Sequence, residues 1–496
     1  MPGTDCSRLA CLLTAAGGVI LSEAKDLNRS TLESSNGRSY SVRRKSYVRL
    51  ARLLGHTEPP LPESTEGLVR TIGRWSLAAL MVNTMIGASI FGLPALIATR
   101  LGSLSPIGFL VAFAAIAVIA ACMAEVASQF QETGGPYLYA RVAFGRFLAI
   151  QNGWLTWLTR IAAVSAVANL FITYLGEFFP GVTAPIPRAV ILTVLIGFLA
   201  VVNYRGVTGG NRLSNCFTVT KVSLLAFFIL AGLAALAFHP QVRVSPAATH
   251  ATSADWFEAV LLMIYSYGGF EAALIASGET HNARKDIPFA LFTAIAATTL
   301  LYVAVQYLVV HTIPDPGISG TPVVDSARRF LPHWAVQIVA AGTLISAYGY
   351  LSANMLHTPR VTFAMGERGD FPAFFGKIHP LFRTPHVSIL IFAVLLLLFS
   401  IFGDFRANAM LSSVARMFVY GSVAAALPVL RKKHPSAEGF RLPGGIAFAI
   451  LALLITAVFV SRMHRGEFIV IATTAALAFA NWLWAIKHPP REIHTY

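Results

Sequence analysis

The stretch Ile86-Gly87-Ala88-Ser89-Ile90-Phe91 places small residues in the middle of a long apolar run, and Pro94 follows it. The stretch Tyr265-Ser266-Tyr267-Gly268-Gly269-Phe270-Glu271 interrupts a second apolar run in a similar way. Small residues at such a place let a helical backbone unwind, which frees amide N–H groups at the start of one half-helix and carbonyl groups at the end of the other. Either stretch alone is more typical of a close contact between membrane helices. Whether these stretches unwind or only pack closely depends on the apolar runs that surround them.

The composition of the chain indicates that lipid, and not water, surrounds these apolar runs. The chain has 496 residues, of which 55% are hydrophobic and 12% charged, and its mean hydropathy is +0.64. Soluble domains carry about 25% charged residues. So few charges cannot cover the water-facing surface of the three or so soluble domains that this length suggests. The sequence therefore excludes a soluble multidomain protein.

Twelve runs are long enough to cross a bilayer, for which a helix needs roughly 20 mostly apolar residues. Because backbone polar groups in lipid must pair within a helix or a closed barrel, and the runs are too long and too continuously apolar for barrel strands, we expect an all-α integral membrane protein. The runs are 72–99, 105–128, 145–176, 186–204, 212–238, 255–278, 286–311, 333–358, 386–402, 407–430, 443–462 and 467–487.

The basic residues indicate the orientation. The net charge is +15, but the Lys and Arg residues are spread over short loops and the N-terminal segment rather than along one face, which argues against nucleic-acid binding. Loops on one side hold 14 of them and loops on the other side hold eight, and both termini are basic as well. Since cytoplasmic loops carry the excess of Lys and Arg, we expect both termini in the cytoplasm and the protein in the cytoplasmic (inner) membrane.

Residues 1–70 differ from the rest in being polar and basic. The apolar stretch 9–21 is long enough for a signal-peptide core but too short to span a membrane. The favoured interpretation is a disordered N-terminal extension or a wrongly assigned start site, in which the basic segment 41–55 is a candidate for contact with the inner leaflet. The four cysteines form no disulfide or zinc pattern, and no cofactor or metal is expected.

The two interrupted runs are the first and the sixth, which are corresponding positions of two five-helix halves. Interrupted helices at corresponding positions indicate a transporter site between inverted repeats, and this combination favours unwinding over simple packing. Freed N–H groups suit a carboxylate, and freed carbonyls suit an ammonium group, so the expected ligand is an α-amino acid. The candidate substrate-binding residues are Ile86, Gly87, Ala88, Ser89, Tyr265, Ser266, Tyr267, Gly268, Gly269 and Phe270.

Ionisable groups inside these runs are costly and therefore pair or face a polar cavity. Burial favours the neutral form of lysine and of glutamate, so Lys221 and Glu271 are candidates for proton coupling, with a static ion pair or carbonyl-bonded anchor as the alternative for each. Arginine keeps its proton in proteins. For Arg160 and Arg416 we therefore favour structural pairing over contact with an anion. Glu125 is a further intramembrane charge, in the inner part of the second run.

Four motifs in order on this frame resemble the amino acid–polyamine–organocation (APC) superfamily of permeases, from about Arg70 to Lys487. They do not fix the substrate. The motifs are the break at Ile86–Phe91, the segment Glu125 to Glu132-Thr133-Gly134-Gly135-Pro136-Tyr137, the segment Gly269-Phe270-Glu271 to Gly278-Glu279 and 282–288, and Pro359-Arg360-Val361 with His379-Pro380 and Arg383-Thr384-Pro385.

The resemblance implies twelve transmembrane helices with a LeuT-type 5+5 inverted repeat, in which helices 1 and 6 are discontinuous. The expected units are 71–240 and 254–432 for the two repeats, 440–488 for helices 11 and 12, and 489–496 for a cytoplasmic tail. The resemblance also implies alternating access, in which helices 1, 2, 6 and 7 rock against helices 3, 4, 8 and 9.

Three residues match family positions. Lys221 matches a lysine on helix 5 that, in related proton-coupled permeases, takes the place of a sodium ion beside the helix 1 break. Tyr265 and Tyr350 fall where related exchangers have gating aromatics, as Tyr where some relatives have Trp, which leaves the selectivity open because Trp is the stronger cation–π partner. Arg160 on helix 3 would lie near the central cavity and disfavour cationic substrates.

We therefore expect a secondary active transporter that imports an amino acid with a proton, with the substrate, protons and the lipid bilayer as its partners and no nucleic acid. An amino acid/amine exchanger of the same fold and a membrane sensor or channel that does not cycle are the alternatives. An enzyme is disfavoured, since the chain has no nucleotide-binding loop, HExxH pair or GxSxG motif. Neither the identity of the substrate nor the oligomeric state follows from the sequence.

Overall fold

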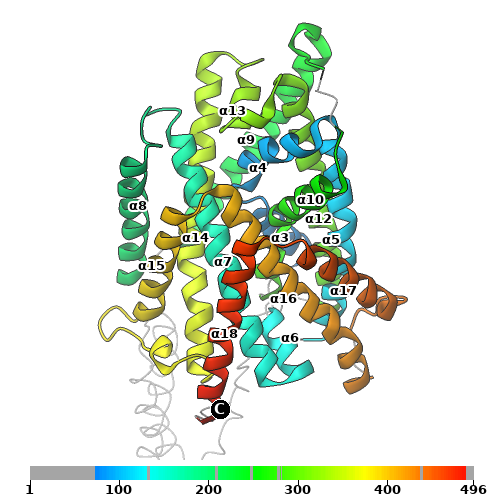
Figure 1. Cartoon of the computed structure of the whole chain (residues 1–496), viewed down its shortest axis with the longest axis vertical. Coiled ribbons are helices and arrows are strands. Elements are labelled where there is room, and N and C mark those ends of the chain that lie inside the picture. The colour runs from blue at the N-terminus through cyan, green and yellow to red at the C-terminus, as the bar shows by residue number, and fades with distance from the viewer. Residues whose placement is uncertain are drawn as a thin grey trace, which may run out of the picture. The chain divides into compact units, whose positions relative to one another are not determined.

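The computed structural model describes residues 73–130, 135–206, 210–245, 250–275, 280, 282–435 and 439–487. The expected N-terminal extension 1–70 and the expected tail 489–496 lie outside the described residues. Figure 1 shows the helices. Their bounds are α3 (Arg74–Met85), α4 (Ser89–Leu101), α5 (Ser105–Ser128), α6 (Gly135–Phe144), α7 (Arg146–Leu175), α8 (Pro185–Arg205), α9 (Gly210–Phe238), α10 (Ser253–Tyr267), α11 (Phe270–Ile275), α12 (Ala283–Thr312), α13 (Pro322–Ala327), α14 (His333–Glu367), α15 (His386–Phe402), α16 (Phe405–Lys433), α17 (Gly445–Ser461) and α18 (Arg465–Lys487).

The described residues form helices and no β-strand, so the all-α prediction is confirmed. Ten of the predicted runs are each occupied by one long helix, and the bounds of α5 and α15 coincide with the predicted ones. The first run is divided between α3 and α4, and the sixth between α10 and α11. The prediction of two discontinuous helices is therefore confirmed.

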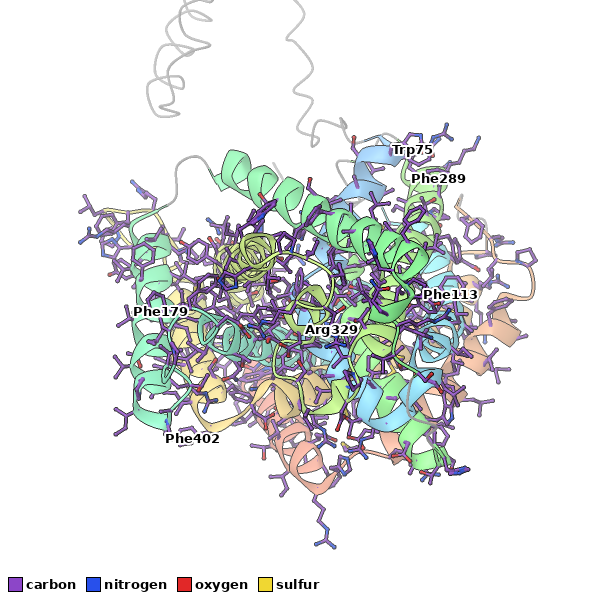
Figure 2. All side chains as sticks on the ribbon, turned by 90° about the horizontal axis from the view of Figure 1, so that it is seen from above. Trp75, Phe113, Phe179, Phe289, Arg329 and Phe402 are labelled. Atoms are coloured by element: carbon purple, nitrogen blue, oxygen red, sulfur yellow. The ribbon has the colours of Figure 1, made fainter. Side chains whose placement is uncertain are left out.

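Length and composition make this a multi-pass membrane protein. Among the described residues, 8 helical segments are long and apolar enough to cross a bilayer, and α15 and α17 are shorter apolar helices. Large apolar side chains point outward from the bundle: Leu230 is 69% exposed and Phe402 84% exposed. Figure 2 shows Phe402 and Phe179 at its periphery. Lipid tails solvate such a surface without the cost that water imposes.

The long helix α7 lies at the centre of one group of elements, where it contacts α14, α15, α16 and α18. A second group forms around α12, which contacts α3, α4 and α5, while α10 packs on α4 and α5. Helix α16 contacts members of both groups, namely α7, α5 and α10. The two interrupted helices therefore belong to the group around α12, and the contact of α10 with α16 joins them to the group around α7.

Near the C-terminal end of α18, buried charges tie several elements together around Asp370, which is fully buried. Its carboxylate accepts hydrogen bonds from Arg146 Nε at 2.7 Å and Arg141 Nη1 at 3.0 Å, and from the Tyr137 hydroxyl. Asn481 on α18 donates to the Asp370 carbonyl at 2.7 Å. Burial, and next the Asp370 charge, raise the pKa of Tyr137 to about 12, so its phenol stays protonated and able to donate at physiological pH.

Candidate functional site

The first break consists of Ile86, Gly87 and Ala88, which lie between α3 and α4. The Gly87 N–H donates to the Met85 carbonyl at 2.7 Å, so this predicted donor already has a partner within the break. Helix α4 begins at Ser89, and the first N–H groups of a helix have no acceptor within it. The N–H groups of Ala88 and Ser89 are therefore the donors that the break leaves for a ligand.

The second break consists of Gly268 and Gly269, which lie between α10 and α11. Gly269 has φ +121°, a conformation that favours glycine. A Cβ atom on Gly269 would lie 2.4 Å from the Thr84 carbonyl oxygen of α3. The second break therefore lies directly against the C-terminal end of α3, just before the first break, and only glycine permits that contact.

A tyrosine that sequence reasoning missed connects the two breaks. The buried Tyr302 hydroxyl on α12 lies 2.9 Å from the Met85 carbonyl, at the end of α3, and 3.0 Å from the Ser266 carbonyl, at the end of α10. A tyrosine inside an apolar helix gives no signal in a sequence, because only the fold shows which carbonyls are near its hydroxyl.

A small cavity lies between the breaks, with a volume of about 10 Å³, room for about one water molecule. Of the predicted substrate-binding and gating residues, the cavity brings together Gly87, Ala88, Ser89, Gly268, Tyr265 and Tyr350. Thr84, Met85 and Val167 also line it and are not among the predicted residues. Arg416, for which structural pairing is the favoured prediction, lines it as well. The residues that line the cavity are Thr84, Met85, Gly87, Ala88, Ser89, Val167, Tyr265, Gly268, Tyr350 and Arg416.

The two tyrosines cover the cavity from different elements. Tyr350 on α14 packs over the first break, where a Cβ atom on Gly87 would lie 3.2 Å from its ring. Tyr265 on α10 donates from its hydroxyl to the Ala163 carbonyl of α7 at 3.1 Å. Both side chains therefore stand where a movement of α10 or α14 changes access to the breaks.

The other predicted contact residues lie beside the cavity and do not line it. The Tyr267 hydroxyl lies 3.1 Å from the Phe109 carbonyl and 2.9 Å from Thr299 Oγ1, which ties α10 to α5 and α12. The Phe270 ring stacks on Tyr420 with 5.5 Å between ring centroids. Of the remaining three, Ile86 and Gly269 belong to the breaks, and Ser266 lies in the last turn of α10.

The intramembrane charges fall into two places. Arg416 Nη1 and Glu271 Oε1 form an ion pair at 3.1 Å beside the second break. Glu125 lies away from the cavity, where its carboxylate accepts two hydrogen bonds of 2.7 Å from Arg431 at the end of α16. Glu125 thus ties α5 to α16, while the pair Arg416–Glu271 belongs to the site.

Lys221 on α9 is buried, and its Nζ donates to the Asn83 carbonyl of α3. Asn83 lies in the last turn of α3, directly before the first break. Arg160 on α7 is half-buried, and it forms no hydrogen bond or ion pair with any residue that the structure describes. Lys221 therefore contacts the helix that the first break interrupts, and Arg160 places a positive charge on the central helix α7.

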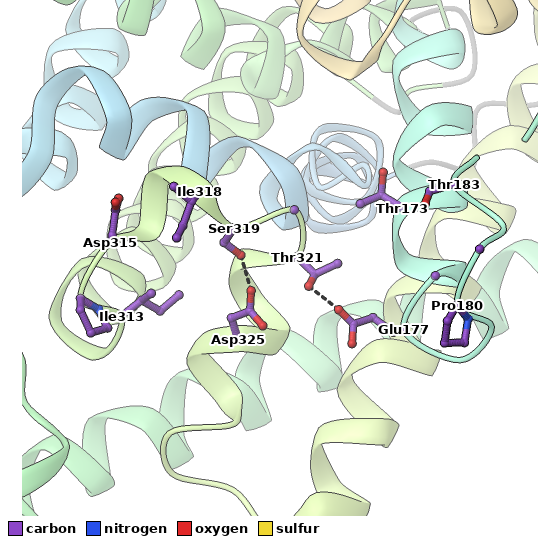
Figure 3. Close-up of a pocket in the computed structure, with 14 residues that line it drawn as sticks. Thr173, Glu177, Pro180, Thr183, Ile313, Asp315, Ile318, Ser319, Thr321 and Asp325 are labelled. Carbon is purple, nitrogen blue, oxygen red and sulfur yellow. Dashed lines mark hydrogen bonds between the residues drawn. The ribbon is translucent and has the colours of Figure 1, made fainter. Parts of the chain in front are cut away.

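A larger pocket of about 670 Å³ lies between the segment after α7 and the segment that joins α12 to α14 (Figure 3). Thr321 donates to a Glu177 carboxylate oxygen at 2.5 Å, and Arg328 forms ion pairs with Glu177 and Asp325. In Figure 1 this region is at the opposite end of the bundle from α6. In the described part of the chain, no group of three metal-ligating side chains is found here or elsewhere.

The comparisons with known proteins agree with this architecture. Residues 72–480 match the family model described as amino acid permease. The methylthioribose transporter of Bacillus subtilis is 28% identical over 400 residues, which are 76% of this chain and 85% of that protein. The branched-chain amino acid permease BcaP of the same organism is 26% identical over 408 residues, or 78% of this chain and 87% of that protein.

The serine/threonine exchanger SteT of Bacillus subtilis is 26% identical over 332 residues, which are 65% of this chain and 74% of that protein. These relatives are transporters with different substrates, so they support the architecture and leave the substrate open. Because the family model covers most of the chain, including both breaks, the protein belongs to the amino acid permease family.

Proposed function

We propose that the protein is a secondary active transporter that moves an amino acid across the cytoplasmic membrane by alternating access, with proton-coupled import. The observation that carries the proposal is the contact between the second break and the end of α3, which brings helix ends of opposite polarity to one cavity. The N-terminus of α4 lies there together with the C-termini of α3 and α10.

These helix ends suit the two charges of an α-amino acid. The N-terminal end of a helix carries partial positive charge and free N–H groups, and the C-terminal end carries partial negative charge and free carbonyls. The N–H groups of Ala88 and Ser89 hold the carboxylate, and the ammonium group binds at the C-terminal ends of α3 and α10, where the Met85 and Ser266 carbonyls also contact the Tyr302 hydroxyl. The cavity of about 10 Å³ belongs to a closed conformation and widens when the two helix groups move apart.

Lys221 is the proposed proton carrier. It bonds the Asn83 carbonyl in the last turn of α3, so a change in its charge alters how firmly α9 holds that half-helix. Glu271 is a weaker candidate, because Arg416 already compensates its charge. The basic loops favour the orientation with both termini in the cytoplasm.

The name of one relative supports a second mode, exchange of one amino acid for another, since the serine/threonine exchanger resembles this chain over 332 residues. Proteoliposomes distinguish the two modes. Net uptake driven by a pH gradient selects symport, and counterflow without a gradient, together with no net uptake when one is imposed, selects exchange. The absence of saturable accumulation or counterflow would leave the sensor or channel alternative.

The variant Lys221→Ala tests the proton step. We expect it to abolish uptake driven by a pH gradient in proteoliposomes, because the group that gains and loses the proton is gone. The matched control is Lys377→Ala, since Lys377 is exposed and has no role in the proposal. Equal proton dependence in wild type and Lys221→Ala would remove Lys221 from the mechanism.

A further inference from the structure

The guanidinium of Arg416 lies directly against the second break. A Cβ atom on Gly268 would fall 1.3 Å from Arg416 Nη1 and 1.9 Å from its Cζ. Arg416 is 5% exposed and lines the cavity between the breaks. The side chain thus occupies the wall beside Gly268, where the side chain of a bound amino acid extends once its carboxylate and ammonium groups are held by the helix ends.

The protein leaves hydrogen-bonding capacity of Arg416 unused. Its Nε and Nη1 make no hydrogen bond with any described residue, although Nη1 lies 3.1 Å from Glu271 Oε1. Glu271 is also engaged elsewhere, since its Oε2 accepts from the Gly269 N–H at 2.9 Å and lies 3.3 Å from the Tyr420 hydroxyl. Because a buried donor without an acceptor is unfavourable, this arrangement calls for an acceptor from outside the protein.

The charges around the cavity limit what that acceptor can be. The lining residues include Arg416 and no Asp or Glu. Glu271 compensates one positive charge, and Arg160 on α7 adds a second that is near enough to act on Glu271 and Tyr350. A cationic side chain would therefore meet net positive charge and no free carboxylate.

We infer that Arg416 binds the side chain of the substrate through an oxygen acceptor, and that the site excludes cationic amino acids. The inference rests on the proposed function, which it narrows to amino acids whose side chains carry a hydroxyl, amide or carboxylate oxygen. Arg416 Nε, together with Nη1 beside its ion pair with Glu271, donates to that oxygen.

Pairs of amino acids with the same shape test the inference. Affinities of the purified full-length protein in detergent are measured by calorimetry for the pairs threonine and valine, and asparagine and leucine. Aspartate and lysine are measured beside them as an anionic and a cationic probe. We expect threonine over valine and asparagine over leucine by roughly ten- to a hundredfold, since a hydrogen bond to a charged group has that effect. The affinity for aspartate compared with that for asparagine shows whether the side-chain oxygen that Arg416 prefers is anionic. Lysine is expected not to bind.

The double variant Arg416→Met/Glu271→Gln isolates the role of Arg416. Removing both charges avoids leaving one buried without a partner, which would compromise folding. We expect the preference for the oxygen-bearing member of each pair to fall to about onefold while valine and leucine bind within a few-fold of wild type. Glu271→Gln alone leaves Arg416 without its charge partner, so its thermal unfolding is measured first; the folded variant keeps the preference, because Arg416 remains. Arg243→Met, at an exposed arginine, is the matched control.

Two results would overturn the inference and leave amino acid transport standing: wild type that binds valine and leucine as tightly as their oxygen-bearing partners, or wild type that binds lysine. A double variant that keeps the preference would overturn it too. Failure to bind any of the twenty amino acids, with methylthioribose as a further probe, would instead contradict the proposed function itself.

Discussion

The two glycines of the second break make contacts that no larger residue could make without displacing its neighbours. Gly269 lies where any Cβ atom would meet the Thr84 carbonyl, and Gly268 lies where one would meet the Arg416 guanidinium. In a membrane helix glycine commonly serves close packing. Here the lack of a side chain lets the second break lie against the end of α3 and against the buried Arg416. The same glycines therefore serve both close packing and unwinding.

Gly269→Ala tests this contact. Alanine at φ +121° is strained, and its Cβ atom would push against the Thr84 carbonyl, whose backbone cannot rotate away as a side chain can. We expect a loss of about 1–3 kcal/mol in stability and at least a tenfold loss in substrate affinity. Thermal unfolding in detergent and a binding titration measure the two effects.

The control for this variant is Gly197→Ala, because a Cβ atom on Gly197 of α8 meets nothing within 4 Å. In a helix interior that change is neutral or stabilising. Unchanged stability and affinity in Gly269→Ala would show that the second break does not lie against the end of α3 as described.

At the scale of elements, the ends of the helices are held by a few buried ion pairs. Asp370, in the segment after α14, joins α6 and α7 through Arg141 and Arg146, and α18 through Asn481. Glu125 joins α5 to α16 through Arg431 in the same manner. Such pairs specify which elements meet, because a buried charge that loses its partner is far costlier than the pair.

Asp370→Asn removes the charge and nearly keeps the shape. We expect stability to fall by about 3–5 kcal/mol, since both arginines lose their compensating charge in a largely buried place. Glu367→Gln, at the exposed end of α14, is the matched control and changes stability little. Equal melting temperatures of the two variants in detergent would mean that Asp370 does not hold these elements together.

At the scale of the whole molecule, the helices and the positions of the two breaks can be predicted from the sequence. Apolar runs predict helix ends well where the chain turns at the membrane surface, as for α5 and α15. They end early for α14, which continues from the predicted residue 358 to Glu367, because Pro359 and Arg360 interrupt the apolar run and the helix continues through them.

Partners distant in the chain could not be predicted. Arg416 and Glu271 were each recognisable as costly charges, but their pairing depends on how α16 crosses the second break. Tyr302 was missed for the same reason, since both of its carbonyl partners belong to other elements. Local patterns report where a helix begins, ends or unwinds, and only the fold reports what it meets.

The central claim is that the two breaks together hold a zwitterion. The most direct test compares three compounds of one shape on the wild-type protein: the amino acid that stabilises it most in a thermal screen, the amine lacking its carboxylate, and the acid lacking its ammonium group. We predict that calorimetry detects binding of the amino acid and at least a hundredfold weaker binding of each of the other two, because each leaves one set of helix ends without its partner. Amine or acid bound as tightly as the amino acid would contradict the account.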